Sequence, residues 1–178
     1  ELSKAYYSLA YAFTNVDDAK KEDEKARDRI NEIKKGYYFT GREFGLRALK
    51  TNDRFGRATE SGANYQAAVE LVDADYADAL QWTASNWGRW GELMGVTKVA
   101  MDIPKFKAIV ERARKLNAST NFGGPHRFLG AYYLKIPKFA GQNPKRARSH
   151  FLKSIEIAPG FLENRLLYAE YYATYADD

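Results

Sequence analysis

Three tryptophans on one stretch of the chain are the first candidates for binding chemistry. Trp82, Trp87 and Trp90 lie within residues 73–91, whose apolar spacing is typical of a helix. At about 100 degrees per residue, Trp87 falls on one apolar face and Trp82, Asn86 and Trp90 on a second. Such a helix packs centrally, and its second face either lines a cavity or is core as well. Asn86 favours a cavity lined by Trp82, Asn86 and Trp90, because a buried amide needs partners.

A second candidate is the run Gly-Gly-Pro-His-Arg at residues 123–127. Glycines at a helix start expose backbone N–H groups that can hold an anion, and Arg127 lies beside them. We expect His126 and Arg127 to sit near the tryptophan face and to receive a carboxylate. The alternative is a tight turn between repeats in which His126 is only a packing residue.

Lys145, Arg146 and Arg148 form a third candidate, a basic face on a predicted helix. Such a face can meet an acidic protein, an anionic membrane or nucleic acid, and it can also be merely solvated. Nucleic-acid binding is the least favoured of these, because the glycine-aromatic signatures of RNA-binding modules are missing. We therefore expect no nucleic-acid partner, and a solvated face, an acidic protein and an anionic membrane stay open as interpretations.

Catalytic and metal-binding patterns are poor. The sequence has no cysteine and only two histidines, His126 and His150, which excludes thiol catalysis, thiolate zinc sites and a multi-histidine metal site. The sequence motifs of serine hydrolases, zinc proteases, phosphate loops and dinucleotide sites are absent as well. We predict a protein that is not an enzyme and that uses no metal and no cofactor.

Composition bounds the architecture that must position these residues. The chain has 178 residues, a formal charge of +5 and 45 % hydrophobic residues, among them 13 Tyr, 10 Phe and 3 Trp. This length favours one domain with a substantial core. No apolar run is long enough for a membrane span. Glu1 is not a natural start, so we expect that a signal or anchor segment has been removed ahead of it.

Helical patterns dominate, and we predict an all-α chain of antiparallel hairpins forming one domain over 1–178. Residues 1–50 would pack, as N-terminal helices, on a repeat region at 53–178. The predicted helices, in chain order, cover residues 2–13, 17–33, 37–49, 54–71, 73–91, 104–116, 125–134, 143–157 and 161–172.

A degenerate tetratricopeptide repeat is the most specific pattern in these helices. His126, Leu129, Gly130 and Tyr133 match its first helix, and a second group, with serine in place of the expected alanine, matches the other: Ala147, Phe151, Ser154 and Pro159. Gly130 would let the partner helix approach, while Tyr133 and Phe151 fill the space between hairpins. Insertions separate the two halves, and a weaker copy lies upstream.

Charge is uneven along this frame. Residues 60–102 carry seven acids and two bases, a net charge of −5, whereas residues 103–153 carry twelve bases and one acid, a net charge of +11. Residues 103–153 are therefore the part of the chain that would attract an acidic partner.

A family resemblance covers nearly the whole chain. It is carried by seven segments in order: DEKAR at 23–27, REFGLRAL at 42–49, ALQWTASNWGRW at 79–90, GPHRFLGAYY at 124–133, PKFAG at 137–141, KRARSHFLKSIEI at 145–157 and LYAEYYA at 167–173. Together they resemble TatT, the T component associated with tripartite ATP-independent periplasmic (TRAP) transporters.

The resemblance implies a periplasmic, lipid-anchored, tetratricopeptide-like protein that binds the solute-binding P subunit and forms oligomers, expected to be trimers. It also implies interior cavities that help to hand over a small, mostly apolar organic ligand. Our leading hypothesis is therefore a non-enzymatic scaffold with Trp82, Asn86, Trp90, His126 and Arg127 around the ligand and the basic face against the partner. The alternative is a generic repeat module that holds a peptide in its groove.

Overall fold

The protein is all-α over the residues that the structure, a computed structural model, describes: 1–12 and 23–176. Its helices are α1 (Leu2–Ala12), α2 (Glu24–Lys50), α3 (Asp53–Glu60), α4 (Tyr65–Val69), α5 (Ala77–Met94), α6 (Val96–Val99), α7 (Ile103–Leu116), α8 (Thr120–Lys135), α9 (Pro144–Ile157), α10 (Leu162–Leu167) and α11 (Thr174–Ala176). Short 3-10 turns occupy Ala74–Tyr76 (η2) and Lys138–Ala140 (η3), and Tyr168–Ala173 (η4) is a π-helix.

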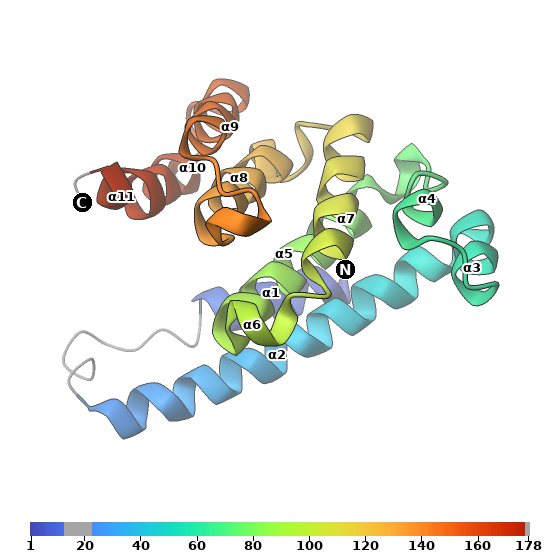
Figure 1. Cartoon of the computed structure of the whole chain (residues 1–178), viewed down its shortest axis with the longest axis horizontal. Coiled ribbons are helices and arrows are strands. Elements are labelled where there is room, and N and C mark those ends of the chain that lie inside the picture. The colour runs from blue at the N-terminus through green and yellow to red at the C-terminus, as the bar shows by residue number, and fades with distance from the viewer. Residues whose placement is uncertain (13–22, 177–178) are drawn as a thin grey trace.

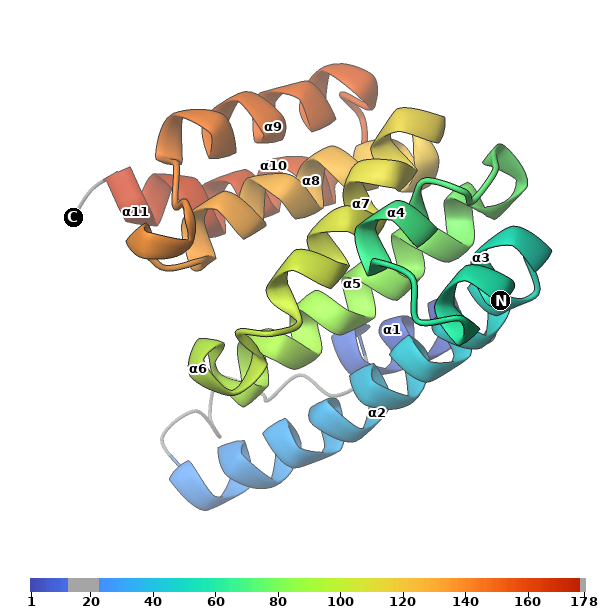
Figure 2. The same cartoon turned by 45° about the vertical axis from the view of Figure 1, so that its right-hand side comes forward.

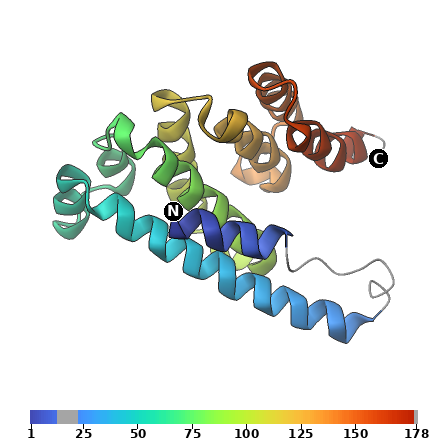
Figure 3. The same ribbon diagram turned by 180° about the vertical axis from the view of Figure 1, so that it is seen from behind.

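The helices stack in layers with α5 and α7 in the middle (Figures 1 and 2). On one side, α1 and α2 cover α5, and the view from behind shows α1 lying alongside both α2 and α5, which also contact each other directly (Figure 3). On the other side, α8 packs on α7 and α5, with α9 and α10 beyond it. The fold thus gives α5 two covered faces, which explains why its sequence is apolar on both.

Glycines set the closeness of the α2–α5 contact. Tyr38, Gly41, Gly45 and Leu49 are buried at helical spacing along one stripe of α2. A Cβ atom added at Gly45 would lie 2.2 Å from the Thr83 hydroxyl oxygen of α5, so any larger residue would push the helices apart.

The α8–α9 hairpin follows the sequence closely. Asn143 caps α9 by accepting a hydrogen bond from the Arg146 backbone N–H at 3.0 Å, and Pro144 occupies the first turn. A Cβ atom at Gly130 would lie 2.7 Å from the Phe151 ring, which confirms the expected close approach at this glycine. The arrangement of these helices as tetratricopeptide repeats stays a prediction.

The structure joins the predicted helices differently at one place and divides them differently at another, and the start expected at residue 17 lies outside the described residues. The helices expected at 17–33 and 37–49 are one helix, α2, because Gly36 has open space around it and one interior glycine costs only about 1 kcal/mol. The helix expected at 54–71 is two, because Gly62 adopts a positive φ of 74° and ends α3. The expected break near residue 15 lies outside the described residues.

Candidate functional site

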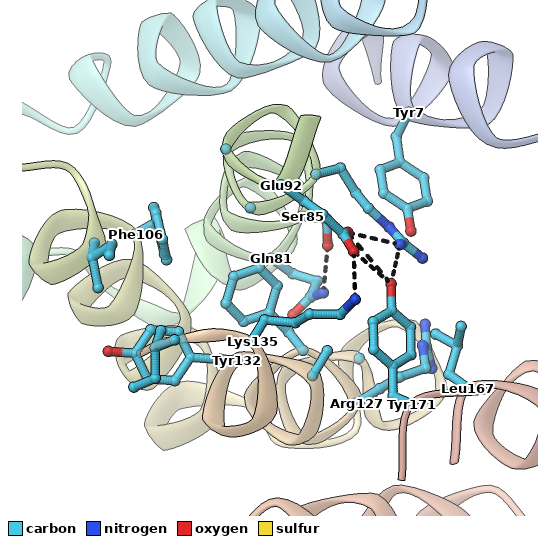
Figure 4. Close-up of a pocket in the computed structure, with 18 of the residues that line it drawn as sticks. Tyr7, Gln81, Ser85, Glu92, Phe106, Arg127, Tyr132, Lys135, Leu167 and Tyr171 are labelled. Atoms are coloured by element: carbon cyan, nitrogen blue, oxygen red, sulfur yellow. Dashed lines mark hydrogen bonds and ion pairs between the residues drawn. The ribbon is translucent and has the colours of Figure 1, made fainter. Parts of the chain in front are cut away.

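A cavity of about 420 Å³ lies between α5, α7, α8 and the C-terminal helices, and Tyr7 of α1 also lines it (Figure 4). Glycines of α5 provide the room, since Gly88 and Gly91 both line the cavity. A Cβ atom at Gly88 would lie 2.5 Å from the Phe128 ring, and one at Gly91 would lie 3.3 Å from Val99. The volume falls within the range that small organic ligands occupy in proteins.

One end of the cavity is aromatic and aliphatic. Phe106 of α7 lies against Phe128 and Tyr132 of α8, with ring centroids 6.2 and 6.1 Å apart and edge-on geometry. Val99 and Ile103 complete this wall. In Figure 4, Phe106 and Tyr132 lie on the side away from Tyr171. This end can hold an apolar group by burial alone.

The opposite end is polar and centres on one carboxylate shared by two cations. Glu92 lies 3.2 Å from Arg89 Nη1 and 3.1 Å from Lys135 Nζ, and Arg89 also donates to the Tyr171 hydroxyl (Figure 4). Partial burial would raise the pKa of Glu92, but Arg89 and Lys135 outweigh it and lower that pKa overall. The four side chains together carry a net positive charge at neutral pH.

Arg127 also lines this cavity, although the cavity is not the tryptophan-lined one beside which we expected it. It is 5 % exposed and donates to Asn164 Oδ1 at 2.6 Å and to the Asn121 carbonyl at 3.3 Å, while its Nη2 lies 3.6 Å from Glu163. Burial lowers its pKa, although Glu163 opposes the shift.

The start of α8 is irregular at the residues that lead to Arg127. Asn121, Phe122 and Gly123 have φ values of 48°, 56° and 82°, a left-handed turn that only glycine adopts freely. Asn164 holds the turn: its Nδ2 donates to the Phe122 carbonyl at 3.0 Å and to the Ser154 carbonyl at 2.8 Å. Gly123 and Gly124 are thus part of a tight turn. Asn164 was not recognised in the sequence because its hydrogen-bond partners are backbone groups distant along the chain.

His126 lies outside the cavity lining and pairs with His150 of α9. Their Nδ1 atoms are 2.9 Å apart, and the His150 ring stacks on Tyr133. Burial lowers the pKa of both, that of His150 to about 4, with the neighbouring His126 as its second cause. We expected His126 beside the ligand. In the structure it instead forms a hydrogen bond with His150 within the α8–α9 hairpin.

Trp82, Asn86 and Trp90 lie on the other face of α5, and none of them lines the cavity. Trp82 packs on Tyr7 of α1 at 5.4 Å between ring centroids, and Asn86 donates to the Ser3 carbonyl at 2.9 Å.

Trp90 packs on α2, where Phe39 lies 6.0 Å away and the Arg42 guanidinium lies over its ring at 4.7 Å. The second apolar face of α5 is thus an interface with α1 and α2, contrary to the expectation that it lines the cavity. The Asn86 amide nitrogen finds its partners in this helix contact, whereas its Oδ1 has no hydrogen-bond partner among the described residues.

Lys145, Arg146 and Arg148 are exposed on α9. The Arg146 guanidinium lies 4.6 Å from the centroid of the Tyr133 ring. Their expected contact with a partner stays a prediction.

Sequence reasoning missed most of the polar cavity wall, namely Gln81, Arg89, Glu92, Lys135 and Tyr171. Arg89 and Glu92 carried a signal, because an i, i+3 ion pair inside an otherwise apolar, tryptophan-rich helix marks a polar position within the fold. Lys135 and Tyr171 come from other helices, and only the fold brings them to this pair.

Within the described residues, no three metal-ligating side chains gather into a site, and no helix is both long and apolar enough to cross a membrane.

Comparison with known families identifies the chain over its whole length. The family model of the TRAP transporter T-component matches residues 1–178. No curated protein matches the chain. The chain therefore belongs to the TRAP transporter T-component family. Its members are accessory transporter components, and the family is not a known enzyme family.

Proposed function

We propose that this T-component binds the solute-binding P subunit of its transporter and helps to hand over a small, mostly apolar organic acid held in the cavity. Family membership supports the transporter role. The observation that carries the ligand proposal is the cavity itself, with an aromatic end at Phe106 and a net positive end around Glu92.

The two ends of the cavity suit the two parts of such an acid. The apolar body gains free energy from burial against Phe106, Phe128 and Tyr132. The carboxylate meets the positive end, where Arg89 and Lys135 share a single protein carboxylate and have donors to spare. Arg127 adds a further buried cation at the cavity wall.

A cavity-filling substitution tests this proposal. Ala131→Trp in α8 places an indole where the apolar body would lie, and Ala48→Trp makes the same change at an exposed position of α2. With decanoate as the probe, calorimetry should show that Ala131→Trp weakens binding by at least tenfold while Ala48→Trp leaves it within twofold. Equal binding by a folded Ala131→Trp protein would overturn the assignment of the ligand to this cavity.

We further propose that the exposed basic residues of α9 contact the P subunit. Lys145, Arg146 and Arg148 provide a compact positive surface, and charge complementarity speeds association and selects partners. The family also supports a periplasmic, lipid-anchored protein that assembles as a trimer.

Charge reversal tests the docking proposal. Changing Lys145, Arg146 and Arg148 to glutamate should weaken binding of the P subunit from the same transporter by tenfold or more. The same reversal at exposed Lys25, Arg27 and Arg29 of α2 changes the net charge equally and should alter binding less than threefold. Equal loss in both triple variants would show a general charge effect and contradict a docking face on α9.

A further inference from the structure

One polar group in the cavity wall is not used by the proposal above. Gln81 of α5 lines the cavity and is only 1 % exposed. Its Nε2 donates to the Ser85 hydroxyl at 2.9 Å, whereas its Oε1 has no hydrogen-bond partner among the described residues. In Figure 4 the Gln81 and Ser85 side chains lie together on the α5 side of the cavity.

The Gln81 amide is held in place by α8. A Cβ atom at Gly124 would lie 2.9 Å from Gln81 Nε2 and 3.0 Å from its Cδ, so the backbone of α8 packs directly on the amide. The Ser85 bond on one side and Gly124 on the other keep the amide from turning toward solvent. Its oxygen therefore stays a buried acceptor.

A buried acceptor without a partner is costly, and a ligand that supplies a donor there gains affinity and selectivity. A site built around such a group discriminates strongly between ligands that carry the matching donor and those that lack it. Arg89 and Lys135 share the single carboxylate of Glu92 in the cavity wall, while Arg127 is paired with Glu163. The donor is therefore a neutral one, because a ligand ammonium group would be repelled.

We propose that Gln81 is a specificity-determining residue and that the cavity takes apolar acids bearing a hydroxyl or amide N–H on the body of the molecule, which Gln81 Oε1 accepts. This inference rests on the proposed function, which supplies the acid and the cavity, and it adds the second polar group. A plain fatty acid satisfies the positive end but leaves Gln81 without a partner.

A panel of ten-carbon acids tests the inference on the wild-type protein. The probes are decanoate, its 3-, 6- and 9-hydroxy derivatives, and 6- and 9-oxodecanoate, whose ketone oxygen accepts but cannot donate. We expect one hydroxy acid to bind about tenfold or more tightly than decanoate, and no oxo acid to do so.

Substitution of Gln81 assigns the preference to its side chain. Gln81→Met keeps the length of the side chain without the acceptor, and it should bind decanoate within threefold of wild type while losing the preference for the hydroxy acid. Gln66→Met makes the same change at an exposed position of α4 and should keep that preference. Gln81→Glu retains an acceptor oxygen, so it should keep the preference while weakening every acid in the panel by charge repulsion.

The outcomes separate the two proposals. If decanoate binds but no hydroxy acid exceeds it by more than threefold, or an oxo acid is preferred, the inference about Gln81 is overturned and the proposed function stands. Retention of the hydroxy preference in Gln81→Met, with an unchanged melting profile, also overturns it. If no acid binds the wild-type protein, the proposed ligand class fails and the inference with it. Should Gln81→Met not fold, the wild-type panel and Gln81→Glu still decide the question.

Discussion

The two faces of α5 have different roles: one packs against neighbouring helices, and the other lines the cavity. The face toward α1 and α2 carries Trp82, Asn86 and Trp90, and every one of them contacts a neighbouring helix. The face toward α8 carries the glycines at 88 and 91, between which Arg89 reaches the polar end of the cavity.

The two faces show that a tightly packed helix surface and a cavity wall have different sequence patterns on α5. Large aromatic side chains fill the space between helices, whereas glycines next to a charged pair leave space open. The tryptophans of α5 therefore mark a packed interface, and Gly88 and Gly91 on its other face line the cavity, whereas Gly41 and Gly45 of α2 allow close packing. Substitutions matched across the two faces test whether they differ in this way.

The largest effect should come from paired ring deletions. Trp82→Ala should lower the free energy of unfolding by about 3 kcal/mol, because it removes packing between α5 and α1, and should leave the dissociation constant for decanoate within twofold. Phe128→Ala should cost about 2 kcal/mol and weaken decanoate about tenfold, because its ring lines the cavity. Chemical denaturation and calorimetry measure both, and equal weakening of decanoate in the two variants would erase the distinction between the faces.

A smaller effect is expected from adding one methyl group to each face. Gly41→Ala places a Cβ atom 2.3 Å from Asn86 Oδ1, where the buried amide cannot yield, and should cost about 2 kcal/mol despite the gain in helix propensity. Gly88→Ala meets the edge of Phe128, which can turn into the cavity, so its net cost should stay below about 1 kcal/mol.

Thermal melts of Gly41→Ala and Gly88→Ala can be compared directly, since both replace a glycine inside a helix. A larger loss in Gly88→Ala than in Gly41→Ala would mean that the cavity wall is packed as tightly as the α2–α5 contact.

The smallest effect on stability concerns the shared carboxylate. Glu92→Gln should lower the free energy of unfolding at pH 7 by about 1 kcal/mol or less, because the Glu92 side chain is 36 % exposed and water weakens its ion pairs. It should also strengthen decanoate binding several-fold, since it removes the carboxylate that competes for Arg89 and Lys135.

The pH dependence of Glu92 has a fixed sign. Its pKa is lower in the folded protein, so its contribution is complete above the unfolded value of about 4.3 and is lost as the pH falls through the folded pKa. Glu92→Gln should lack that part of the acid-induced loss. Glu43→Gln serves as the control, because Glu43 pairs with Arg42 at 2.9 Å on the α2 side, and it should leave decanoate binding unchanged.

Much of the helix arrangement could be predicted from the sequence by rules that involve only neighbouring residues. The cap at Asn143, the proline after it and the close contact of Gly130 with Phe151 are decided by neighbours along the chain or by steric size, so they could be predicted. Gly36 misled the prediction because a glycine permits a break without requiring one.

The candidate site was harder to predict from the sequence, because its lining depends on which neighbouring helix covers each face of α5. Periodicity shows that α5 has two apolar faces, but it does not say that α1 and α2 cover the tryptophans. Arg127 was a candidate because it follows a local glycine run, and its role in binding stays a prediction, whereas Tyr171 joins Arg89 across 82 residues of sequence.

The C-terminal wall of the cavity also bears on when the cavity exists. Residues 77–136 supply most of its boundary, and Leu167 and Tyr171 close one side from α10 and η4. During synthesis on the ribosome the aromatic end is therefore made first, and the wall formed by Leu167 and Tyr171 is added only after the helices that it faces. A chain that stops before residue 167 would lack this wall, and its cavity would be more open to solvent.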